Sequence, residues 1–193
     1  MKKIEKDVIV IGSGPGGYAA AFYLADHGKT VTLIEKSDLG GVCLNSGCIP
    51  SKALLNIAGM IDKSKKYSDY GVSFTDPKIN LDKIRAHKES IINKLRQGIE
   101  SLAKARNVEV INGRGVFEDS STLRVESESG QEYYSFNHAV IATGSRPFIP
   151  SSLDLGNPRI MTSYDALNLE DIPKDLLVIG GGYIGMELGS VFV

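Results

Sequence analysis

A glycine-rich turn between two short apolar runs constrains the fold of this chain more than any other feature. Residues 7–11 (Asp-Val-Ile-Val-Ile) have the β-branched character of a buried parallel strand. The fingerprint Gly-Ser-Gly-Pro-Gly-Gly occupies residues 12–17, a helical stretch follows at residues 18–27, and residues 31–34 form a second apolar run. This order predicts a βαβ unit of a parallel sheet.

The residues of this unit have separate expected roles. Gly12 makes the tight turn, Gly14 admits a pyrophosphate to the backbone, and Gly17 lets the helix pack closely on the strand. The phosphates would lie at the helix N-terminus. Glu35 ends the second strand, where its carboxylate would accept hydrogen bonds from an adenosine ribose. Because strand, helix and acid agree in position, we predict a dinucleotide site and not a glycine turn without a ligand.

The only two cysteines of the chain, Cys43 and Cys48, lie close together in the sequence. Pro50 suits the first turn of a helix, and apolar residues continue at helical spacing after it, so Cys48 would lie at or just before a helix N-terminus. The helix dipole favours a thiolate there. The pair therefore predicts a reversible, reactive disulfide.

Other interpretations of the cysteine pair stay open at this point. A structural disulfide is one, although closing so small a loop would add little stability. Two buried apolar thiols are another. A metal site normally has three or four ligands, and no histidine or further cysteine lies near this pair.

Composition excludes several classes of partner. The net charge of −1 implies no general attraction to nucleic acid or to an anionic membrane. No apolar run has the length of a membrane span, and the N-terminus leads almost directly into the first strand without a signal or transit segment. We therefore expect a cytoplasmic protein without a nucleic-acid or membrane partner.

The middle of the chain changes from helical to strand character. A polar region at residues 63–77 precedes an amphipathic helix from Leu81 to Leu102. Short strands of a predicted antiparallel meander follow at residues 108–111, 115–117, 123–126 and 132–136, and a buried strand follows at residues 138–144.

A second strand and fingerprint close the chain, at residues 175–179 and 180–185. A βαβ unit needs about 30 residues, and the chain stops at Val193. We therefore expect a fragment of a longer protein, with a first domain at residues 1–150 and a linker plus the truncated start of a second domain at residues 151–193.

Two such fingerprints flanking a Cys-x4-Cys pair resemble the layout of the pyridine nucleotide-disulfide oxidoreductases. Residues 40–55 (Gly-Gly-Val-Cys-Leu-Asn-Ser-Gly-Cys-Ile-Pro-Ser-Lys-Ala-Leu-Leu) are most similar to the dihydrolipoamide dehydrogenase branch, and mercuric reductase is the second resemblance. The resemblance implies an α/β fold: a FAD-binding Rossmann-like parallel sheet with an antiparallel β-meander, plus the start of a second, NAD-binding Rossmann-like unit. The interface (dimerisation) domain of the family is absent from this sequence.

The resemblance also implies two sets of cofactor-binding residues. Those expected at FAD are Gly12, Ser13, Gly14, Pro15, Gly16, Gly17, Glu35, Lys36, Gly40, Gly41, Val42, Cys43, Cys48, Lys52, Arg114, Gly115, Ala142, Thr143, Gly144 and Ser145. Those expected at the start of the NAD site are Gly180, Gly182, Tyr183, Ile184, Gly185 and Glu187. Val42 stands where the family often has Thr, so a hydroxyl contact to FAD is missing; Ser46 is expected at a loop position.

By the same resemblance, four residues would be catalytic. Cys43 would exchange with dihydrolipoamide, and Cys48 would lie closer to the flavin in a charge-transfer contact. Lys52 and Glu187 would form an ion pair beside the flavin, with the carboxylate holding a buried ammonium charged. Electrons would pass from dihydrolipoamide through the disulfide and FAD to NAD⁺.

The implied partners are those of the whole enzyme. Dihydrolipoamide would be carried by the acyltransferase or lipoyl protein of a 2-oxo acid dehydrogenase or glycine cleavage complex, and the parent would be a homodimer. The family's His–Glu base is not replaced by His27, His87 or His138, so we expect this chain alone to be inactive. The alternatives are another NAD(P)H-dependent disulfide reductase and a FAD-binding module without turnover.

Overall fold

The computed structural model describes residues 3–192, which group into two compact units. The first unit contains residues 1–45 and 94–145, and the second contains residues 46–93 and 146–193. These units do not coincide with the predicted segments 1–150 and 151–193, because residues 46–93 pack with the C-terminal part. The assignment of FAD and NAD to the predicted segments stays a prediction.

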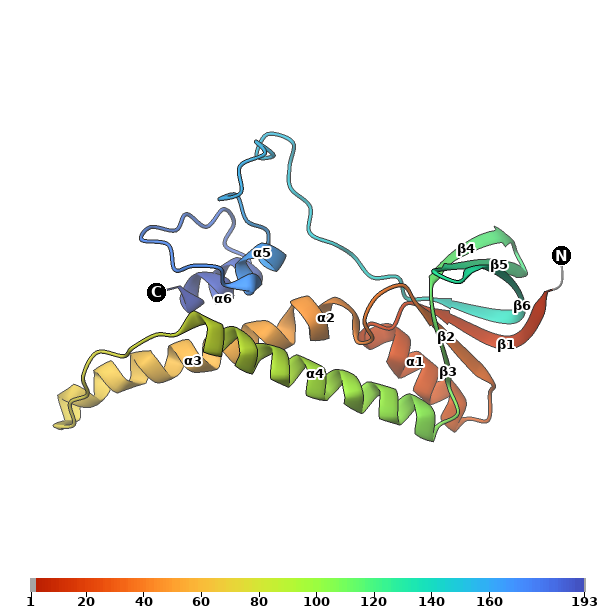
Figure 1. The fold of residues 1–193 in the computed structure, drawn as a ribbon, viewed down its shortest axis with the longest axis horizontal. Coiled ribbons are helices and arrows are strands. Elements are labelled where there is room, and N and C mark those ends of the chain that lie inside the picture. The colour runs from red at the N-terminus through yellow and green to blue at the C-terminus, as the bar shows by residue number, and fades with distance from the viewer. Residues whose placement is uncertain (1–2, 193) are drawn as a thin grey trace. The chain divides into compact units, whose positions relative to one another are not determined.

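The first unit is built on a six-stranded sheet in the order β3-β2-β1-β6-β5-β4 (Figure 1). The strands are β1 (Ile4–Ile11), β2 (Val31–Glu35), β3 (Glu109–Asn112), β4 (Arg114–Asp119), β5 (Thr122–Ser127) and β6 (Gly130–Ile141). Four of them, β3, β2, β1 and β6, are parallel neighbours, whereas β6, β5 and β4 pair antiparallel. The sequence prediction of a mostly parallel sheet with an antiparallel part is confirmed.

Two details of the predicted meander are wrong. The strand expected at residues 108–111 is β3, which pairs in parallel with β2 and not within the meander. The strands expected at 132–136 and 138–144 are one continuous strand, β6, which ends at Ile141; its residues 130–135 pair with β5 and its residues 134–141 pair with β1. A strand that follows a helical crossover returns parallel to the strand before the crossover, which explains β3.

The core of this unit lies between the parallel strands and the meander. Ile9, Ile11 and Ile34 pack against Leu123 and Tyr134. The sheet curls so that β4 approaches β2. Helix α1 (Pro15–Asp26) contacts β1, β2 and β6 and lies away from β4 and β5 in Figure 1. Helix α2 (Gly41–Ser46) follows β2.

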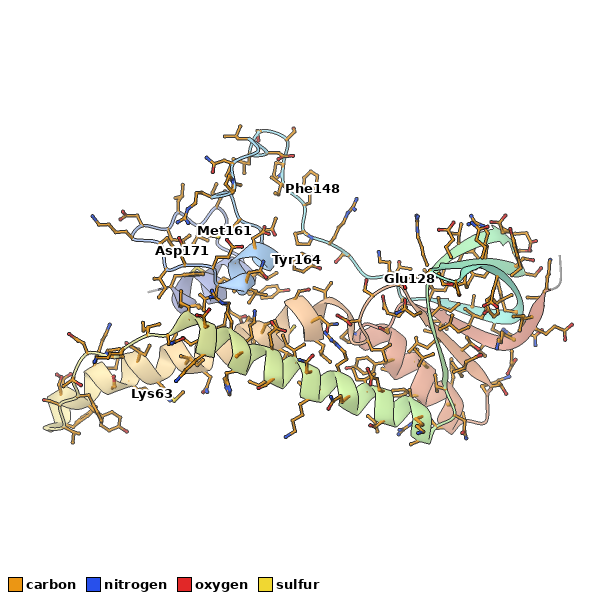
Figure 2. The ribbon with its side chains drawn as sticks, in the orientation of Figure 1. Lys63, Glu128, Phe148, Met161, Tyr164 and Asp171 are labelled. Carbon is orange, nitrogen blue, oxygen red and sulfur yellow. The ribbon has the colours of Figure 1, made fainter. Side chains whose placement is uncertain are left out.

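The second unit is helical in the described residues. Its elements are α3 (Cys48–Lys66), the short 3₁₀ helix η1 (Tyr67–Tyr70), the first half of α4 (Leu81–Ala105), α5 (Ser163–Asn168) and α6 (Tyr183–Val191). A cluster of Leu54, Leu167, Leu169 and Leu188 joins α3, α5 and α6. Figure 2 labels Lys63 in the last turn of α3 and Tyr164 on α5.

The end of α5 is fixed by two cations from α4. Lys88, which is buried, donates to the carbonyl of Leu167, and Arg85 donates to the carbonyls of Leu169 and Glu170. Carbonyls at a helix C-terminus lack partners within the helix, and cations near them are favoured. Residues of α4 therefore hold the segment that precedes the second fingerprint.

The strand predicted at residues 175–179 is wrong for the described structure, where these residues have no strand conformation. A strand exists only with a hydrogen-bonded partner, and no strand of the described chain pairs with this segment. In residues 3–192, no helix combines the length and apolar character needed to cross a bilayer.

Candidate cofactor site and redox loop

The first glycine fingerprint forms a turn that only glycine can occupy at two positions. Gly12 has a φ of +95°, and a Cβ there would lie 2.2 Å from the carbonyl oxygen of Ala142. A Cβ on Gly17 would lie 1.8 Å from the carbonyl oxygen of Gly12. These contacts agree with the roles predicted for a tight turn and for close packing of helix on strand.

The turn leads into the N-terminus of α1. Gly14 is the N-cap and makes no side-chain capping hydrogen bond, and Pro15 begins the helix. The first backbone N–H groups of a helix have no partner within it and carry the positive end of the dipole. This end of α1 is therefore suited to bind a pyrophosphate.

The second fingerprint repeats this geometry in the other unit. Gly180 has a φ of +106°, and a Cβ on Gly185 would lie 2.7 Å from the carbonyl oxygen of Gly180. Gly182 is the N-cap of α6, again without a side-chain capping bond. The turn has the backbone geometry of a dinucleotide fingerprint although residues 175–179 are not a strand.

Glu35 lies at the end of β2 with its carboxylate turned toward the first fingerprint. Its Oε2 accepts hydrogen bonds from the backbone N–H and the hydroxyl of Ser13, both at 2.7 Å, and its Oε1 accepts from the N–H of Ser37 at 3.0 Å. An ionised carboxylate offers about four acceptor sites. The acceptor capacity of Oε1 suffices for a ribose hydroxyl in addition to Ser37.

Ser13 connects Glu35 to the loop that precedes Cys43. The Ser13 side chain is fully buried, and its hydroxyl and carbonyl oxygens both accept from the N–H of Gly40, at 3.2 and 3.1 Å. Ser13 therefore contacts Glu35 on one side and the start of the loop on the other.

The loop before α2 approaches the fingerprint at a glycine–glycine contact. Gly40 and Gly41 have φ values of +103° and +61°, in the region that favours glycine. A Cβ on Gly41 would lie 2.5 Å from the Cα of Gly14. The redox loop, defined as residues 38–41, leads into α2 and is thus in backbone contact with the phosphate-binding turn.

Asn45 and Arg96 hold this loop, and sequence reasoning assigned a role to neither. The Asn45 amide donates to the carbonyls of Leu39 and Gly41, both at 3.0 Å, and its Oδ1 accepts from Arg96 at 2.9 Å. Arg96 also pairs with Asp38 at 3.0 Å. The position of Asn45 between the two cysteines was the one available signal; nothing in the sequence pattern marks Arg96.

Each cysteine belongs to a helix. Cys43 is half-buried within α2, a helix that the sequence did not predict, and Ser46 ends that helix, so its expected loop position is wrong. Cys48 is exposed and is the first residue of α3, as predicted. Pro50 lies in the first turn and is buried. The disulfide between Cys43 and Cys48 stays a prediction.

The ion pair expected between Lys52 and Glu187 is present within the second unit. The ammonium of Lys52 lies 2.6 Å from both carboxylate oxygens of Glu187, and the hydroxyl of Ser51 lies 3.5 Å from one of them. The Lys52 side chain is 57% exposed, so the expected burial of its ammonium is wrong in this structure. Its position beside a flavin stays a prediction.

Two further segments expected at FAD lie at the same end of the sheet as Gly12 and Glu35. The N–H of Gly113, just before Arg114 and Gly115, donates to the carbonyl of Glu35 at 2.8 Å. Thr143 lies against Gly12, since a Cβ on Gly12 would be 3.2 Å from its Cα. Ligands of open α/β sheets bind at the carboxyl ends of the strands, which is where these segments meet. Lys36, Val42, Gly144 and Ser145 are exposed.

A cavity of about 460 Å³ opens beside Glu35 in the first unit. Its apolar lining includes Leu39, Ala103 and Val110. Its charged lining is mixed, with two cations and three carboxylates: Arg96, Lys104, Glu35, Asp38 and Glu100. Sites of this size and character accommodate small organic ligands.

Known proteins are similar to this chain in sequence and in fold. The family model for pyridine nucleotide-disulphide oxidoreductases matches residues 6–193. A dihydrolipoyl dehydrogenase of Vibrio parahaemolyticus is 46% identical over 192 residues, which are 99% of this chain and 40% of that protein. One of Bacillus subtilis is 46% identical over 189 residues, which are 98% of this chain and 40% of that protein.

The same likeness holds among solved structures. The Cu(II) complex of the HOCl-induced flavoprotein disulfide reductase RclA from Escherichia coli matches with a TM-score of 0.81 and 31% identity. The match covers 100% of this chain and 40% of that one. The chain thus spans about two fifths of the length of these relatives.

Proposed function

This chain belongs to the pyridine nucleotide-disulphide oxidoreductase family, and from that premise we propose that it is the FAD- and disulfide-bearing part of an enzyme that oxidises dihydrolipoamide to lipoamide with NAD⁺. The observation that carries the proposal is the contact of Gly41 with Gly14. Because α2 begins at Gly41, Cys43 is held close to the turn that would bind the FAD pyrophosphate.

The residues of the first unit fit the adenosine and pyrophosphate parts of FAD. The N-terminus of α1 would hold the pyrophosphate, and Glu35 would hold the ribose. The adenosine would extend from Glu35 toward the cavity lined by Leu39 and Val110. The bound flavin would supply a two-electron acceptor for the reduced cysteines.

The proposed reaction of this chain is thiol–disulfide exchange between dihydrolipoamide and the Cys43–Cys48 disulfide, which needs no third reactant. A thiolate of dihydrolipoamide attacks Cys43, breaks the Cys43–Cys48 bond and forms a mixed disulfide, and the thiolate of Cys48 leaves. The second substrate thiol then displaces Cys43, so the substrate loses two electrons and two protons, and the protein gains two thiols. The position of Cys48 at the N-terminus of α3 suits a leaving thiolate.

Steady-state turnover is proposed for the whole protein, because this chain spans 40% of the length of its relatives. NAD⁺ as the final acceptor, a homodimer and a lipoyl-bearing protein partner belong to the same proposal. The repeated fingerprint at Gly180 supports a second dinucleotide, and 46% identity to dihydrolipoyl dehydrogenases supports the dithiol substrate.

Anaerobic reaction of the FAD-loaded protein with dihydrolipoamide tests the proposal. One equivalent of dihydrolipoamide should either bleach the flavin absorbance or generate two protein thiols. One equivalent of lipoamide should be recovered after the reaction is quenched with acid. The Cys43→Ser variant should bind FAD equally and form no lipoamide. Equal lipoamide formation by that variant would count against the thiol mechanism, and absent FAD binding would count against the cofactor.

A second candidate is the reduction of Cu(II), favoured by the likeness to a flavoprotein solved as a Cu(II) complex. Two neighbouring thiolates suit copper in its lower oxidation state. Two Cu(II) ions would take one electron each as the dithiol becomes a disulfide. The rates at which Cu(II) and NAD⁺ reoxidise the whole protein after reduction by dihydrolipoamide would rank the two candidates.

A further inference from the structure

The amide of Asn45 lies between the redox loop and helix α4. Its nitrogen donates to the carbonyls of Leu39 and Gly41 at 3.0 Å each, with the Asp38 carbonyl at 3.3 Å. Its oxygen accepts from two nitrogens of Arg96, at 2.9 and 3.3 Å. Asn45 therefore uses both ends of its amide.

Arg96 determines which way this amide points. A guanidinium carries only donors, whereas the loop carbonyls carry only acceptors. The amide oxygen must therefore face Arg96, and the nitrogen must face the loop. Arg96 is itself oriented by Asp38 at 3.0 Å, and its side chain is only 23% exposed.

The carbonyls held by Asn45 flank the glycines that touch the phosphate-binding turn. Leu39 precedes Gly40, whose N–H donates to Ser13, and Gly41 abuts Gly14. Both glycines have positive φ values. Glycine adopts positive and negative φ about equally well, so the contacts around these two residues must favour the conformation seen. The same loop continues into α2 with Cys43.

We propose that Asn45 and Arg96 are positioning residues for the redox disulfide. Together they fix the loop at residues 39–41, and through it the place of Cys43 against the phosphate-binding turn. This inference rests on the proposed function, because it assigns the two residues a part in the chemistry of that same site. Neither residue contacts the substrate in this role.

Two substitutions test separately the hydrogen bonds from Asn45 to the loop and the hydrogen bonds from Arg96 to Asn45. Asn45→Asp keeps the shape and the bond with Arg96 but replaces the donor to the loop carbonyls by an acceptor. Arg96→Lys keeps the charge beside Asp38 but cannot hold the amide through two nitrogens. Arg106→Gln is the matched control, since Arg106 follows the same helix, is 30% exposed and pairs with Asp26 outside the loop.

The readout is the equilibrium of the full chain with glutathione. Two glutathione molecules are oxidised to one glutathione disulfide as the Cys43–Cys48 bond becomes two thiols. A displaced loop lowers the effective concentration of one thiol near the other, so Asn45→Asp should shift this equilibrium toward the dithiol by up to about tenfold, the size of one lost hydrogen bond between uncharged groups. Arg96→Lys should shift it in the same direction by less.

Thermal melting of each variant accompanies the titration. The inference is supported when Asn45→Asp and Arg96→Lys shift the equilibrium while Arg106→Gln matches the wild type. It is overturned when Asn45→Asp matches the wild type, or when the control shifts equally. If Asn45→Asp does not melt cooperatively, Arg96→Lys decides by the same criterion.

The proposed function can fail separately from the inference. A wild-type chain that forms its disulfide but does not react with dihydrolipoamide contradicts the substrate and leaves the comparison of variants decisive. A wild-type chain that forms no disulfide in oxidised glutathione overturns both, since nothing remains for Asn45 and Arg96 to position.

Discussion

Glu187 receives the Lys52 ammonium between its two carboxylate oxygens, at 2.6 Å from each, although the residues lie 135 positions apart. The pair joins the second turns of α3, which begins at Cys48, and of α6, which follows the second fingerprint. The side chains are 57% and 31% exposed, so solvent screens the attraction.

We expect this ion pair to contribute little to stability. A double-mutant cycle with Lys52→Gln and Glu187→Gln, measured by denaturant unfolding, should give a coupling of at most about 1 kcal/mol. The exposed pair of Arg159 and Asp171 serves as the control and should give a coupling in the same range. A coupling several times larger than the control would show that the pair is more shielded from water than its exposure indicates.

Replacing Glu35 by Gln should weaken FAD binding. The loss of a charged acceptor for the ribose corresponds to about 1.5–3 kcal/mol, roughly a ten- to hundredfold rise in Kd. Flavin fluorescence titration measures this change. Glu109→Gln is the control, because Glu109 is a carboxylate of the same sheet whose partners are Lys6 and Thr32. Equal effects of the two substitutions would contradict the ribose assignment.

Gly41→Ala should destabilise the first unit and impair FAD binding together. Its left-handed backbone alone costs a non-glycine residue about 1–2 kcal/mol, and the new methyl group would lie 2.5 Å from the Cα of Gly14. Gly98→Ala, in the middle of α4 with open space around it, should instead stabilise by roughly 0.5–1 kcal/mol. Denaturant unfolding of both variants measures the contrast, and a neutral Gly41→Ala would refute the close approach.

The stability of the first unit should fall in acid partly through Glu109. Burial by itself would raise the pKa of Glu109, but hydrogen bonds from Lys6 and Thr32 outweigh it and hold the pKa below its ordinary value of 4.5. A carboxyl group with a depressed pKa in the folded state stabilises fully above its unfolded pKa, and this contribution is lost as the pH falls through the folded pKa.

Glu109→Gln should therefore lower stability near neutral pH and flatten the acid limb of the stability profile. Urea unfolding at several pH values above and below the ordinary carboxyl pKa tests this. Because Glu109 is about half exposed, the effect should be modest. A variant whose acid limb is as steep as that of the wild type would assign the acid dependence to other carboxylates.

The sequence alone determined the features that depend on neighbouring residues. Gly12 and Gly17 were expected from sterics, and the structure leaves no room for a Cβ at either. The start of α3 at Cys48 followed from Pro50 and the apolar spacing after it. Glu35 was recognised because an acid at the end of a second strand has a fixed place in a βαβ unit.

Only the tertiary structure decided features that depend on distant partners. Arg96 reaches Asn45 across 51 positions, and no local pattern distinguishes Arg96 from the other cations of an amphipathic helix. The parallel pairing of β3 and the lack of a strand at residues 175–179 have the same origin. Steric limits and helical periodicity depend on residues that are close in the sequence, so they can be predicted from it. A distant hydrogen-bond partner or a neighbouring strand is brought into contact only when the chain folds.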